Sequence, residues 1–398
     1  MKPDNGEVFA QSKKSRYFVL NYNMRQAPDR HCSGTSGVRH LNLILCYIQA
    51  LDGLYSALKD PPFDWKKPPP PRVRVDLRDS ACPWAFPPIA GREAYIELPC
   101  RYEEPNLQTV RQLAAVNATH EAAHLFTFAA RPPASDKERH LWTWMHEATA
   151  VFLEGYMCHG NPEANRFALE WVDQPHMSLN APAPSPWRHS QPYHSGWFLK
   201  YLARREGPRV VGELWNDPRS GESPFEALHR LRRGLDVLDS TGESSPFFTE
   251  YCFDSYYLND NNLDSFAPDL YARYRARALR AWATLGPAAP YQADDAVSNL
   301  ACHYYRIDPA AGVKRIEARL THGREAGLRM AVERVTRDLA RGAQRIAPPG
   351  SPRAGDTEAA TASLQGPFTT DTDHVVICVA NPKLASHEAW YRLEVQAS

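Results

Sequence analysis

The sequence predicts an α+β protein whose C-terminal part is an all-β, sandwich-like domain. Helix-spaced apolar residues dominate the first three quarters of the chain, where a few short alternating segments interrupt them. Period-two alternation then takes over toward the C-terminus. At 398 residues the chain has room for two or three domains. We expect a flexible N-terminus over residues 1–14, a first domain over 15–290 and the sandwich over 291–398.

The composition is that of a globular protein and disfavours two kinds of partner. Apolar residues make up 43% of the chain and charged residues 23%. The 46 basic and 46 acidic side chains cancel, so we expect no nucleic-acid partner. No apolar run reaches the roughly 20 residues of a membrane-spanning helix. The polar start lacks an export segment, which predicts a cytoplasmic protein unless the natural start is incomplete and the protein is secreted.

The expected elements of the first domain follow in chain order. An α/β part over 15–130 holds a strand at 16–23, a helix at 38–60, strands at 72–79 and 94–100, and a helix at 106–130. The proline-rich tract over 60–71 can only be a connector. A mainly helical part over 131–290 begins with a helix from 136 to about 159 and continues with helical patterns at 192–207, 209–217, 224–234, 247–258 and 267–285.

One sequence motif on the helix expected at 106–130 suggests a catalytic metal site. It places His120, Glu121 and His124 in the order H-E-x-x-H. Residues four apart lie on one helix face, so both imidazoles can reach one Zn²⁺ while Glu121 holds a water beside it. Asn117 falls on the same stripe and is a candidate to support the site from behind.

The next helix offers a third ligand. Glu147 lies in the apolar segment HLWTWMHEATAVFLEGYM, where an unpaired carboxylate would cost several kcal/mol. Glu154, seven residues further on, shares its face.

The string HEAAH followed by WMHEATAVFLE resembles the gluzincin metallopeptidases, also called the peptidase MA-like clan. The resemblance implies a zincin-like catalytic domain built from a mixed sheet and a helical subdomain. It implies one Zn²⁺ per chain, held by His120, His124 and Glu147, with Glu121 as the general base. Glu154 matches a family glutamate that stands behind the ligands.

Two further roles are expected around the metal. Tyr193-His194-Ser195-Gly196 is similar to the family's Tyr-x-x-Gly, so Tyr193 is the expected oxyanion donor and His194 the alternative. The strand AYIELPC ends at a proline and reads as an exposed sheet edge. An extended peptide could pair with that edge along Tyr95, Ile96, Glu97 and Leu98.

The expected function is a zinc-dependent peptide hydrolase in which Glu121 assists the attack of a zinc-bound water on a peptide carbonyl. No G-x-M-E-N motif precedes the metal helix, which favours an endopeptidase acting on a peptide or protein substrate. The alternative is an inactive, peptidase-like zinc-binding or recognition module. Glu121 favours the enzyme, because a purely structural zinc site has no use for it.

Overall fold

The computed structural model describes residues 11–22, 38–78, 83–88, 93–100, 102, 106–132, 136–159, 161, 174–180, 195–217, 219–238, 246–256, 279–323, 327–336, 359–368, 373–384 and 388–398. The chain divides into two compact units. The first is Met1–Ala168 with Ser195–Pro224, and the second is Leu169–His194 with Phe225–Ser398. The fold is therefore mixed helix and sheet, as the sequence predicts. In the described parts of the chain, no helix combines the length and apolarity needed to span a membrane.

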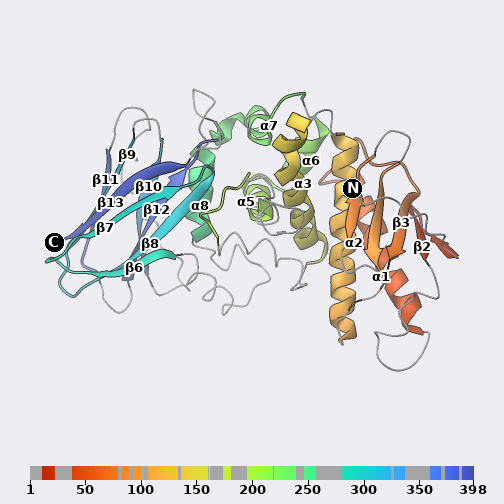
Figure 1. Ribbon diagram of the computed structural model, residues 1–398, viewed down its shortest axis with the longest axis horizontal. Helices are drawn as coiled ribbons and strands as arrows, with labels where there is room; N and C mark the ends of the chain where they lie inside the picture. The colour runs from red at the N-terminus through yellow and green to blue at the C-terminus, as the bar shows by residue number, and fades with distance from the viewer. Residues whose placement is uncertain are drawn as a thin grey trace. The chain divides into compact units, whose positions relative to one another are not determined.

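The first unit is a five-stranded sheet with helices on one face (Figure 1). Its elements are β1 (Gln11–Lys14), β2 (Phe18–Tyr22), α1 (Val38–Lys59), β3 (Val73–Arg78), β4 (Trp84–Phe86), β5 (Tyr95–Pro99), α2 (Leu107–Ala130), α3 (Asp136–Met157), α5 (Gly196–Glu206) and α6 (Arg209–Asn216). The helices expected at 38–60, 106–130 and 136–159 are confirmed as α1, α2 and α3. Part of the segment expected to be flexible, Gln11–Lys14, instead pairs with β2 as a strand.

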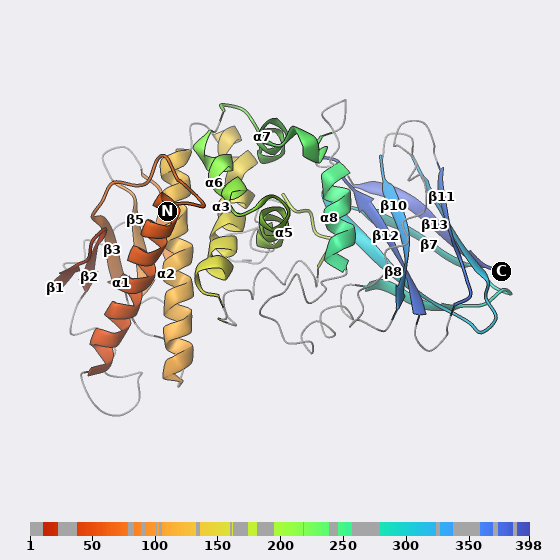
Figure 2. The same cartoon turned by 180° about the vertical axis from the view of Figure 1, so that it is seen from behind.

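Apolar spacing explains how α1 and α2 cover the sheet. Tyr47, Leu51, Leu54 and Leu58 follow each other at intervals of four, three and four residues, and all are fully buried. α1 contacts β2 of the sheet, and α1 and α2 pack along each other (Figure 2). α3 packs in turn on α2, and α5 on α3. The layer order places α2 between the sheet and α3.

The strand order is β1-β2-β3-β5-β4. β2, β3 and β5 are parallel, and β4 pairs antiparallel with β5 through Ala85 opposite Ile96. β5 therefore has a neighbour on each side, and the prediction that AYIELPC is an edge strand is wrong. The edge is β4, which is only three residues long and lies between Pro83 and Pro87.

The second unit contains α7 (Pro224–Leu231), the short 3₁₀ turn η3 (Arg233–Leu235), α8 (Pro246–Tyr256) and eight strands: β6 (Leu279–Leu285), β7 (Tyr291–Val297), β8 (Ala301–Pro309), β9 (Arg315–His322), β10 (Arg329–Thr336), β11 (Ala359–Gln365), β12 (Asp373–Asn381) and β13 (Ala389–Ala397). The strands form two four-stranded sheets, ordered β10-β12-β8-β6 and β11-β9-β13-β7. Both sheets contribute alternate residues to one apolar core, which includes Ile316, Ile377 and Leu393. This agrees with the sandwich-like expectation.

One element of this unit differs from expectation. Residues 279–285 were expected to end a helix, but they form β6, which pairs parallel with β8. The β-rich region thus begins before the expected boundary at residue 291. The sequence here, LRAWATL, is rich in helix formers, yet Ala281 and Ala283 face the core while Trp282 is exposed. Pairing with a neighbouring strand overrides the local preference.

Candidate metal and catalytic site

The site is built on α2, which begins at a well-formed cap. The side-chain oxygen of Asn106 accepts hydrogen bonds from the backbone N–H of Gln108 at 2.8 Å and of Thr109 at 3.5 Å. Three turns later the helix carries His120, Glu121 and His124, which are only 7, 5 and 6% exposed. Burying three ionisable side chains in successive turns is costly unless they are paired or bind an ion.

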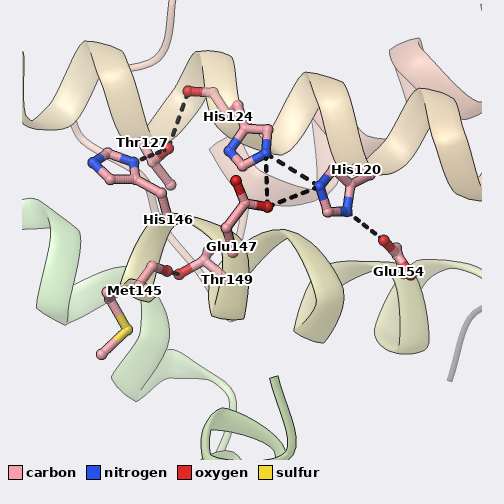
Figure 3. Close-up of polar contacts among 8 residues, drawn as sticks. All are labelled: His120, His124, Thr127, Met145, His146, Glu147, Thr149 and Glu154. Carbon is pink, nitrogen blue, oxygen red and sulfur yellow. Dashed lines mark hydrogen bonds and ion pairs between the residues drawn. The ribbon is translucent and has the colours of Figure 1, made fainter. Parts of the chain in front are cut away.

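α3 brings a carboxylate to the two histidines (Figure 3). Oε2 of Glu147 lies 3.2 Å from Nε2 of His120 and 3.4 Å from Nε2 of His124, and the two Nε2 atoms are 3.2 Å apart. Ligand atoms about 2.1 Å from a tetrahedral zinc lie about 3.4 Å from each other. Two imidazoles and one carboxylate are also donors that zinc accepts. The three side chains predicted from sequence therefore come together in a geometry that fits one zinc ion.

The charged groups in this cluster shift each other's pKa in the direction that favours ionisation. Burial alone would raise the pKa of Glu147, but His124 and His120 hold it below its ordinary value. Burial alone would lower the pKa of His120, yet Glu147 and Glu154 raise it well above its usual range. Glu147 is thus an anion aimed at the two imidazoles, as a metal ligand must be.

Glu154 contacts a ligand from behind. Its Oε1 forms a short hydrogen bond with Nδ1 of His120, and the side chain is 1% exposed. Burial raises the pKa of Glu154 to about 7, with His120 acting in the opposite direction. A carboxylate on the second ring nitrogen fixes the tautomer that leaves Nε2 free to ligate.

Glu121 interacts electrostatically with all three candidate ligands and contacts the edge of the sheet. The backbone N–H of Ala85 donates to its carboxylate. Burial raises the pKa of Glu121, while His120, His124 and the Ala85 hydrogen bond limit the rise. A buried carboxylate whose pKa is shifted toward neutrality is suited to accept and return a proton.

Asn117 does not support the ligands in the expected way. Its Nδ2 donates to the Tyr102 hydroxyl at 3.1 Å, and that hydroxyl also lies 2.9 Å from the Tyr47 hydroxyl. Asn117 therefore joins α2 to α1 and to the segment after β5. Sequence reasoning missed this role because Tyr102 and Tyr47 are distant along the chain.

The four residues expected to bind substrate lie on an interior strand of the sheet and not on its edge. Ile96 and Leu98 are fully buried on the helix-covered side of β5. Glu97 instead forms an ion pair of 2.6 Å with Arg78, and Tyr95 stacks on Phe86 with ring centroids 4.4 Å apart. None of the four lies on an exposed edge. The signal for the true edge was the pair of β-forming aromatics in Pro83-Trp84-Ala85-Phe86-Pro87, since prolines are tolerated beside edge strands.

Tyr193 and His194 lie outside the described residues. The description resumes at Ser195, and α5 begins at Gly196. A Cβ on Gly196 would meet Cγ1 of Val151 at 2.5 Å, so only glycine allows this close approach to α3. The start of α5 thus lies one turn from Glu147 along α3.

Comparisons with known proteins identify no family. No protein-family model matches the chain. No curated protein matches it either. Among solved structures, a similarity was found to the Aeromonas hydrophila protein PliG, a periplasmic inhibitor of g-type lysozyme. The two chains are 15% identical, the match covers 30% of this chain and 98% of that one, and the TM-score is 0.19. Similarity at that score carries no argument about function.

Proposed function

We propose that this protein is a zinc-dependent peptidase of the gluzincin type, with a zincin-like first unit. The observation that carries the proposal is the convergence of His120, His124 and Glu147 on one point, with the non-liganding Glu121 beside them. Bound at these three atoms, Zn²⁺ would lower the pKa of a water molecule and polarise a substrate carbonyl.

Glu121 moves the protons. It accepts one from the attacking water and returns it to the leaving amine. The rise in its pKa that burial causes supports this role, because the same carboxyl must hold and release a proton within one turnover. Tyr193, or His194 in its place, remains our candidate for steadying the oxyanion.

The edge strand β4 supports a peptide as the substrate. Ala85 donates its N–H to Glu121, so this group points away from β5. In an antiparallel pair the N–H and C=O of one residue point the same way, so the Ala85 carbonyl also points away from β5. Because Glu121 already accepts from the Ala85 N–H, the carbonyl is the group of Ala85 with which a peptide could pair. An extended peptide pairing there would run beside the general base. We therefore propose that the substrate pairs with Trp84–Phe86 and not with Tyr95–Leu98. We expect peptides to be cut internally.

The test combines metal analysis with digestion of a mixed peptide library. We expect about one zinc per chain, loss of that zinc in the His120→Ala/His124→Ala double variant, and internal cuts by the wild type. Zinc without any cleavage would favour the inactive zinc-binding module. Stoichiometric zinc in the double variant would show that the metal is bound elsewhere.

A further inference from the structure

The two candidate histidine ligands are held in different ways. Nδ1 of His120 is hydrogen-bonded to Glu154, whereas Nδ1 of His124 is buried and has no hydrogen-bond partner within the described residues. A histidine that ligates through Nε2 normally donates its other N–H to a carboxylate, a carbonyl or a water, and this bond fixes the ring. The described residues do show a contact of another kind beside the His124 ring.

That contact is an aromatic ring one turn further along α2. Phe128 stacks on His124 with the ring centroids 5.8 Å apart and the planes only 15° from parallel. Phe128 also meets the ring of His146 on α3 at 5.3 Å, and His146 meets Trp215 on α6 at 4.9 Å. A row of four rings thus runs from the ligand across three helices.

Hydrogen bonds hold the third ring of this row, His146, in place. The Thr127 hydroxyl donates to the His124 carbonyl at 3.0 Å. Its single proton is then used, so it accepts from Nδ1 of His146 at 2.7 Å (Figure 3). His146 is thereby tied to the α2 backbone at His124 itself. Phe128 packs against a ring that cannot turn freely.

We propose that Phe128 is a positioning residue for His124. It orients the His124 ring, as Glu154 orients the ring of His120. The proposal rests on the proposed zinc site, but not on its peptidase activity. Without the flat ring at position 128, the His124 imidazole can turn about its side-chain torsions, and Nε2 leaves the point it shares with His120 and Glu147. Zinc binding then loses one well-placed ligand while the helix remains.

The test compares two phenylalanines on the same helix. Phe128→Leu removes the ring beside His124, whereas Phe126→Leu removes a fully buried ring that contacts Tyr55 and Trp65 instead. Zinc affinity is measured by competition with a chromophoric chelator, and the site geometry by the visible absorption of the Co²⁺-loaded protein. We expect Phe128→Leu to weaken zinc binding about 10- to 100-fold and to change the Co²⁺ spectrum. Phe126→Leu should lower the melting temperature with zinc affinity within about twofold of wild type, and Phe128→Tyr should restore binding.

The outcomes separate this proposal from the proposed function. Wild-type affinity in Phe128→Leu, or equal loss in both leucine variants, would overturn the positioning role. A wild-type protein that binds no zinc overturns both proposals. Zinc binding that depends on Phe128, in a protein that cuts no peptide, overturns only the peptidase.

Discussion

At the scale of single residues, Glu121 differs from His120 and His124 because its carboxylate accepts a hydrogen bond from the sheet edge at Ala85 and is not one of the three candidate ligands. Replacing it with glutamine keeps the volume but removes the base. We expect Glu121→Gln to retain zinc and to lower kcat by about 10²- to 10⁴-fold, measured on an internally quenched peptide. Glu213→Gln, which removes the charge that Glu213 pairs with Arg209 on α6, is the control. Full activity in Glu121→Gln would rule out the proposed base.

Glu154 gives a second prediction at this scale. Its carboxylate forms a hydrogen bond with Nδ1 of His120. Glu154→Gln retains a hydrogen-bonding group without the charge, so we expect zinc affinity to fall about tenfold or more. Chelator competition measures the change. An unaltered affinity would mean that the His120 ring is oriented without this bond.

The sequence predicted the local part of the site better than the distant part. His120, Glu121 and His124 follow from helical periodicity alone, because one helix fixes their relative positions. Glu147 was found because burying a carboxylate on an apolar helix demands a partner. Glu154 was found because it lies seven residues further on the same face and matches a glutamate of the gluzincin pattern. Phe128, Thr127 and His146 gave no such signal. Each is an ordinary helix residue until α2 and α3 are packed together.

At the scale of elements, alanine substitutions at two helix glycines are expected to change the free energy of unfolding in opposite directions. A Cβ on Gly212 of α6 would lie 2.0 Å from the Phe63 carbonyl oxygen, a backbone atom that cannot move aside cheaply. Gly212→Ala should therefore lower the free energy of unfolding by about 1–3 kcal/mol. A Cβ on Gly53 of α1 would meet nothing within 4 Å, so Gly53→Ala should raise it by about 0.5–1 kcal/mol. Urea titration of the two variants checks both signs.

The helices were predictable from sequence, whereas β4 and β6 were not. α1, α2 and α3 are long and periodic, so several turns support each assignment. β4 is three residues long, and β6 is made of helix formers, so both exist only through their partner strands. The position of β5 also determines the effect of a proline there. Because Ile96 lies on a strand with a paired strand on each side, we expect Ile96→Pro to destabilise the first unit as a whole.

At the scale of the whole molecule, the second unit contains a buried histidine that makes stability depend on pH. His303 on β8 is 4% exposed, and its Nδ1 lies 2.7 Å from the Tyr391 hydroxyl. Burial lowers its pKa from 6.5 to about 4; Asp295 opposes the shift, and Arg280 and His176 add to it. Between these pH values the unfolded chain binds the proton more readily than the folded one.

The stabilising contribution of a neutral His303 is therefore complete above about pH 6.5 and is lost as the pH falls toward 4. The loss amounts to about 3 kcal/mol. We expect His303→Gln to flatten this part of the curve when unfolding free energies are measured by urea titration between pH 7 and pH 4. His322→Gln, at the end of β9, serves as the control. Parallel curves for wild type and His303→Gln would refute the assignment.

The two edge strands of the five-stranded sheet affect whether copies of the chain aggregate at high concentration. β1, with sequence QSKK, is exposed along its length and carries Lys13 and Lys14, and β4 offers only three residues. Long, flat, apolar edges recruit strands from other molecules and seed aggregates, whereas lysines and brevity discourage this. The same short β4 that could take one extended peptide is a poor template for stacking many chains. We expect the first unit to resist edge-to-edge aggregation at high concentration.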